Sequence, residues 1–97
     1  MSQLIKEHQW IYVVVQEPEN DAQYLGQYES ANDIAFIPVF LEKDHALMCL
    51  NLLVKESGKK YEVQAVMYEE LVEHARSGGF QLYILAEDGT IREKIEP

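Results

Sequence analysis

The sequence predicts an α+β fold, a single small domain in which a mixed β-sheet carries two packed helices. Strand-like and helix-like segments follow one another in the order β-β-β-α-β-α-β-β, with hairpins at both ends and helical crossovers between them. The chain has 97 residues, of which 47% are hydrophobic, so it can form a core without disulfides or a structural metal. Residues 1–97 are therefore expected to form one domain, in which residues 1–9 could be an arm.

The first two strands are marked by β-branched and aromatic residues. Residues 10–15, WIYVVV, have strong strand propensity and are expected to be buried on at least one face. An acidic loop containing proline then leads to a second strand at residues 22–28. In this strand Gly26 shares a face with Tyr24 and Tyr28, which indicates a twist, a bulge or a close approach by another segment.

The central part of the chain contains a strand that leads directly into an apolar helix. Residues 34–41 form a nearly continuous apolar run, typical of an inner strand covered on both faces. Pro38 cannot donate to a ladder, so the strand must lack a partner on one side at that point or must bulge.

A period near 3.6 predicts the first helix at residues 42–54. Its expected core face consists of Ala46, Leu47, Leu50, Leu53 and Val54. Met48 and Leu52 project outside that arc. This second apolar side is either covered by the chain itself or reserved for a partner.

The remaining elements are a strand, a second helix and a terminal hairpin, at residues 61–66, 68–77, 80–86 and 91–95. The strand alternates as a half-buried strand does, and the helix begins with acids and ends at Gly78-Gly79. Asp88-Gly89 is the strongest hairpin signal in the chain. The expected buried stripe of the second helix consists of Tyr68, Leu71, Val72 and Ala75.

The charge balance is strongly acidic. Eight basic residues against seventeen acidic ones give a formal net charge of −9. Such a surface repels nucleic acid and anionic membranes, so neither is expected as a partner. The amino terminus does not have the pattern of a signal peptide, and no apolar run is long enough to span a membrane. With Cys49 as the single cysteine, no internal disulfide can form, and a cytoplasmic location is expected.

The central residues carry a resemblance to a known family. The run Phe36-Ile37-Pro38-Val39-Phe40 is followed by a charged turn, an apolar helix, a strand, an acidic-starting helix and a Gly-Phe-Gln-Leu strand that leads to Asp88-Gly89. This order resembles the amino-terminal domain of SseB-like proteins, and it is similar to a family of small bacterial and plastid domains. Leu41 departs from the SseB-like pattern, in which a hydroxyl residue usually caps the helix. The resemblance implies a small α/β domain without an established activity.

One pair of side chains has the spacing of metal ligands. His45 and Cys49 are four residues apart on the first helix, so they can converge on one ion, and His74 would be a third ligand if the fold brought it near. Two ligands do not make a site, and cysteine is often buried in its own right. We therefore expect no metal or other cofactor. A metal- or small-ligand-binding regulatory domain that uses His45 and Cys49 is the alternative hypothesis.

The leading hypothesis is a non-enzymatic, cytoplasmic protein-interaction or regulatory module that self-associates as a homodimer. No catalytic residue is assigned, because the acids do not follow the spacing of a calcium loop and no phosphate loop or nucleophilic triad is present. Met48 and Leu52, together with Tyr24 and Tyr28 on the second strand, are expected to form an exposed patch. Such a patch would contact a protein partner or a second copy.

Overall fold

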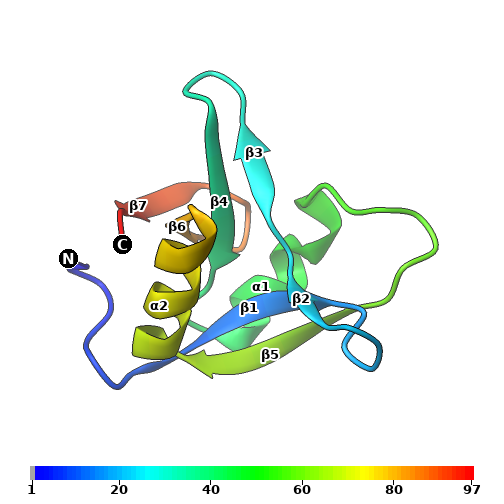
Figure 1. Cartoon of the computed structure of the whole chain (residues 1–97), viewed down its shortest axis with the longest axis horizontal. Helices are drawn as coiled ribbons and strands as arrows, with labels where there is room; N and C mark the ends of the chain where they lie inside the picture. The colour runs from blue at the N-terminus through cyan, green and yellow to red at the C-terminus, as the bar shows by residue number, and fades with distance from the viewer. Residues whose placement is uncertain (1) are drawn as a thin grey trace.

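Two strands, β1 (Trp10–Gln16) and β4 (Ile34–Val39), lie at the centre of the structure, a computed structural model that describes residues 2–97 (Figure 1). Within these residues the chain forms seven strands in two sheets and two α-helices, so the predicted α+β class is confirmed. The other elements are β2 (Gln23–Tyr24), β3 (Gln27–Glu29), α1 (Lys43–Cys49), the 3₁₀ turn η1 (Leu50–Leu52), β5 (Tyr61–Met67), α2 (Tyr68–Gly78), β6 (Gln81–Leu85) and β7 (Ile91–Ile95).

The prediction of one mixed sheet is wrong, because the strands divide between two sheets. One is antiparallel with the order β2-β1-β5, and the other has the order β3-β4-β6-β7, in which β4 and β6 run parallel. The predicted strand at residues 22–28 breaks at Leu25 and Gly26, so that β2 pairs with β1 while β3 pairs with β4. Tyr12 and Phe40 join the two sheets by a bridge of two hydrogen bonds, each 2.9 Å long.

The break at Gly26 coincides with the close approach that the sequence indicated there. A Cβ atom at Gly26 would lie 3.2 Å from Cε1 of Phe80, so only glycine fits without a shift of the ring. The preceding residue, Leu25, is buried, and its N–H donates to the carbonyl of Val14 at 2.8 Å. The chain thus leaves one sheet and enters the other within two residues.

Pro38 lies where the central strand lacks a partner on one side, as predicted. β3 pairs with β4 only as far as Phe36, and the bridge to β1 is made by Phe40. Alternate residues of a strand direct their main-chain groups to the same side, so the nitrogen of Pro38 faces the gap between these two contacts. The missing N–H therefore breaks no ladder hydrogen bond.

The two helices cover opposite faces of the strands. Leu71 and Ala75 of α2 pack with alternate residues of β1, β4 and β6, whereas Ala46 and Cys49 of α1 pack with the intervening ones. This division follows from strand geometry, because neighbouring side chains point to opposite faces. α2 agrees with its prediction and ends at Gly79 in the left-handed conformation, with φ of 76°. In the part of the chain that the structure describes, residues 2–97, no helix is long and apolar enough to cross a membrane.

The first helix is shorter than predicted, and its expected core face is only partly correct. α1 ends at Cys49, and after η1 the chain becomes extended. Gln27 holds this extended segment: its side-chain amide accepts from the N–H of Val54 at 2.9 Å and donates to the carbonyl of Val54 at 2.8 Å. Within the predicted helix, Ala46 and Cys49 are buried, whereas Leu47 and Val54 are exposed.

The terminal hairpin forms as predicted. β6 and β7 are antiparallel, and Gly89 adopts a φ of 87° in the turn between them. Asp88 accepts a hydrogen bond from the N–H of Thr90 at 3.0 Å, and this contact lowers the pKa of its carboxyl. The N-terminal hairpin is also present, since β2 returns antiparallel along the end of β1.

Residues 2–9 contain no helix or strand, but they pack against the domain. Ile5 is buried in the core beneath α2. Glu93 of β7 accepts hydrogen bonds from the Ser2 hydroxyl at 2.7 Å and from the N–H groups of Gln3 at 2.8 Å and Leu4 at 3.2 Å. Burial alone would raise the pKa of Glu93, but these hydrogen bonds outweigh burial and lower it. The arm is therefore fastened through an ionised carboxylate.

Replacing Glu93 with glutamine should weaken the attachment of the N-terminal arm. It should also reduce the pH dependence of the free energy of unfolding in the acidic range. A carboxyl group whose pKa is lowered by folding stabilises the fold above its ordinary pKa of 4.5, and this contribution disappears as the pH falls through the folded value. We expect Glu93→Gln to cost about 1 kcal/mol at pH 7 and less at pH 3. Urea denaturation at both pH values measures this difference. Glu96→Gln, an equal charge change on the exposed neighbouring segment, is the control, and a cost for Glu93→Gln that does not vary with pH would contradict the expectation.

Candidate functional site

The outer side of α1 and η1 carries exposed apolar side chains, Leu47, Met48 and Leu52, which we call the α1 surface. Their exposed fractions are 48%, 63% and 62%. Because Ala46 and Cys49 point into the core, a helix that turns 100° per residue directs Leu47 and Met48 toward solvent, and Leu52 follows Met48 one turn later. An apolar strip of this kind suits contact with another protein.

His45 connects α1 with the hairpin between β6 and β7. Its Nε2 lies 3.4 Å from a carboxylate oxygen of Glu42 and 3.6 Å from one of Glu87. Its Nδ1 is buried, and within residues 2–97 it has no hydrogen-bond partner. Both carboxylates therefore lie beside the same ring nitrogen.

The predicted metal ligands are not brought together. Cys49 is completely buried, and this burial, together with the charge of Asp88, raises the pKa of its thiol and disfavours the thiolate that a metal requires. His74 cannot be the third ligand, because α2 lies across the strands from α1. Among residues 2–97, no three His, Cys, Asp or Glu side chains form a group that could hold a metal ion.

The two tyrosines predicted for the interaction patch lie on the other side of the molecule from the α1 surface. Tyr24 packs against the core beneath α2, and its ring meets that of His74 edge-on with centroids 4.8 Å apart. Tyr28 is 61% exposed and is paired with Ala35, which lies on the same face of β4 as the residues under α2. The prediction of one patch made of both tyrosines with Met48 and Leu52 is therefore wrong. The break at Gly26 and the alternation of β3 separate them.

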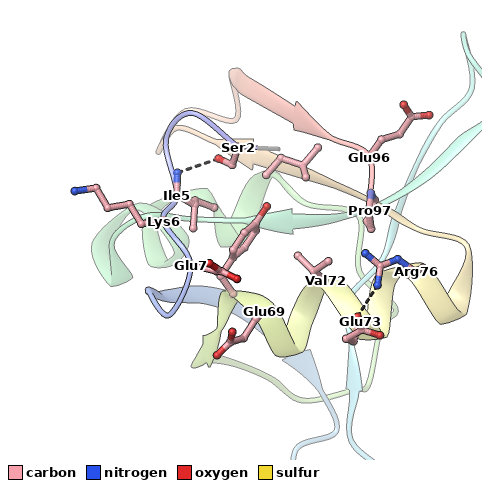
Figure 2. Close-up of a pocket in the computed structure, with 12 residues that line it drawn as sticks. Ser2, Ile5, Lys6, Glu7, Glu69, Val72, Glu73, Arg76, Glu96 and Pro97 are labelled. Atoms are coloured by element: carbon pink, nitrogen blue, oxygen red, sulfur yellow. Dashed lines mark hydrogen bonds and ion pairs between the residues drawn. The ribbon is translucent and has the colours of Figure 1, made fainter.

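A cleft of about 680 Å³ lies between the N-terminal arm, α2 and the end of β7 (Figure 2). Its apolar lining comes from Ile5, Tyr68, Val72 and Ile95, and its charged lining comes from Lys6, Glu7, Glu69, Glu73, Arg76 and Glu96. The sequence does not predict this cleft, because residues 1–9 have no clear helix or strand pattern. Ile5, an apolar residue in a polar arm, was the signal that could have indicated packing there.

Two acidic groups of the cleft are paired with basic side chains. Glu69 lies 2.9 Å from Nδ1 of the exposed His8, and Glu73 bonds to Arg76 one turn along the helix, as Figure 2 shows. An apolar floor with a charged rim is an arrangement for binding. The acids outnumber the bases along this rim, so a ligand there would meet a negative field.

Comparisons of the chain with protein-family models, with curated proteins and with solved structures gave no match. The resemblance to SseB-like proteins thus stays a prediction from the sequence pattern. The functional argument for this chain rests on its own surfaces, of which the α1 surface, the cleft and the sheet edges are the main ones.

Proposed function

We propose that this protein is a non-enzymatic, cytoplasmic protein-interaction module that self-associates through the α1 surface. The observation that supports it most is the exposure of Met48 and Leu52, at 63% and 62%, one turn apart on the same side. Burial of two such side chains against a second copy would remove apolar area from water at a gain of about 25 cal/mol per Å². Tyr28, exposed on the other side of the molecule, is available for a different protein partner.

Replacing both Met48 and Leu52 with aspartate should convert the self-associated protein into a folded monomer. Two charges per copy would be desolvated in the contact, so we expect the dissociation constant to rise by about a hundredfold or more. The core is left intact, because neither side chain is buried. Sedimentation velocity over a range of concentrations measures the association, and circular dichroism during heating measures the fold.

Tyr28→Asp is the matched control, since Tyr28 is 61% exposed but lies on the opposite side. It should leave self-association unchanged. A double aspartate variant that associates like the wild type would show that the α1 surface is not the contact. A variant that fails to fold would show that Met48 and Leu52 contribute to the core.

The alternative, a metal- or small-ligand-binding regulatory domain, has less support. For a metal, His45 and Cys49 would need a third ligand and an accessible thiolate, and Cys49 is buried with a raised pKa. For a small ligand, the cleft beside α2 has a suitable volume of about 680 Å³. His45 and Cys49 do not line that cleft, so the metal site and the small-ligand site of this alternative would lie in different parts of the protein.

A further inference from the structure

β5 is a long strand at the edge of its sheet. It has seven residues, it pairs with β1 on one side, and in the order β2-β1-β5 it has no strand on the other (Figure 1). Edge strands in natural proteins are usually shortened, charged or covered, because their free main-chain groups can pair with another chain. β5 is not short, and Glu62 is its single charged residue.

The other sheet edges are protected in the usual ways. β2 has two residues and β3 has three, so neither can support a long ladder. β7 has five residues, of which Arg92, Glu93 and Lys94 are charged. β5 therefore differs from every other edge of the described residues 2–97 in combining length with low charge.

The hydrogen bonds of β1 determine which main-chain groups of β5 are free. Tyr12 exchanges hydrogen bonds with Phe40, so its main-chain groups point away from β5. The main-chain N–H and C=O groups of its neighbour Val13 must point toward β5, where Val13 is paired with Gln64. The N–H and C=O groups of Gln64 therefore point toward β1. The residues on either side of Gln64 in β5 direct their N–H and C=O groups away from β1, into solvent.

We infer that β5 pairs antiparallel with β5 of a second copy, about a two-fold axis at Gln64. In this register Val63 is opposite the partner's Ala65 and Tyr61 is opposite the partner's Met67, so residues with outward main-chain groups face one another along the whole strand. Glu62 is opposite the partner's Val66. No like charges are opposed, whereas a register centred on Glu62 would place two carboxylates together.

This pairing specifies the geometry of the proposed self-association, and it rests on that proposal. The three-stranded sheets of the two copies would join into one sheet. α1 contacts both β1 and β5, so the α1 helices of the two copies would lie on the same face of the joined sheet, close to the axis. Strand pairing would fix the relative orientation of the two copies, and the apolar α1 surfaces would add buried apolar area to the contact.

Charged side chains introduced at the axis test this inference. Gln64 is exposed and meets itself in the dimer, so Gln64→Glu and Gln64→Lys each place like charges in direct opposition. Each variant alone should dimerise about fivefold more weakly than the wild type. An equal mixture of the two, with one variant labelled with ¹⁵N, should recover the dimer as a heterodimer, which native mass spectrometry then identifies by its mass. Variants that dimerise as well as the wild type, with no preference for the heterodimer, would overturn the inference.

Ala65→Pro is the second variant, because it removes an outward N–H without a charge. It should weaken dimerisation about tenfold or more, since two hydrogen bonds across the axis are lost. If the Gln64 and Ala65 variants associate normally while the Met48 and Leu52 double variant is monomeric, self-association stands and the strand pairing is wrong. A wild-type protein that is monomeric at all concentrations would instead overturn the proposed function.

Discussion

Tyr83→Ala should lower the free energy of unfolding by about 3–5 kcal/mol, which is a large fraction of the stability of a small domain. Tyr83 is completely buried on β6, and its ring stacks on that of Phe36 at 4.1 Å between centroids and 12° between planes. Its hydroxyl donates to Glu29 at 3.2 Å, and Nζ of Lys94 lies 5.1 Å from the ring centroid. Truncation would remove these contacts and leave a cavity between α1 and the strands.

The matched control is Tyr83→Phe, which keeps the ring and removes the hydroxyl. It should cost about 1 kcal/mol, the usual net value of one hydrogen bond. Urea denaturation followed by circular dichroism gives both values. If the two variants were equally stable, the ring would not be part of the core as the structure places it.

Gln64→Pro should destabilise the protein by about 2–4 kcal/mol, whereas Ala65→Pro should cost much less. The N–H of Gln64 bonds to β1, so proline there would remove a ladder hydrogen bond and press its ring against the neighbouring strand. The N–H of Ala65 faces solvent in one copy, which is the position that tolerates proline in an edge strand. Thermal melting at concentrations low enough to keep the protein monomeric separates this effect from dimerisation.

The comparison of these two prolines also tests which main-chain groups of β5 face solvent. Both residues are exposed and lie next to each other, so side-chain burial does not distinguish them. Only the direction of their main-chain groups does. Equal destabilisation by the two substitutions would mean that the alternation deduced from the bridge between Tyr12 and Phe40 does not continue along β5.

The two proposed contacts make different demands on the protein. The α1 surface requires exposed apolar side chains, which Met48 and Leu52 provide. The β5 edge requires free main-chain groups and a register without opposed charges, which the stretch around Gln64 provides. Side-chain substitutions on α1 and charges introduced at Gln64 of β5 therefore give independent results, although both are read from the same association measurement.

Elements whose signals lie within a few residues of one another could be predicted from the sequence. The strand propensity of residues 10–15, the Asp88-Gly89 turn and the stripe of α2 with its glycine end each depend on neighbours along the chain, and the structure confirms all three. Pro38 belongs with them, because a missing N–H restricts strand pairing wherever the residue occurs. Helical periodicity also placed Met48 and Leu52 outside the core face, and the structure shows that both are exposed.

What only the tertiary structure decided depends on residues that are far apart in the sequence. Gln27 holds the extended segment after the first helix by bonding to Val54, which is 27 positions away, and Glu93 fastens the arm from about 90 positions away. Phe80 fits against Gly26, so one expected strand becomes two and one expected sheet becomes two. Local periodicity carries no information about these contacts, because each requires a partner that only the folded chain brings within reach. For the same reason the sequence could nominate Met48 and Leu52 as a surface but could not show that Tyr24 and Tyr28 face the other way.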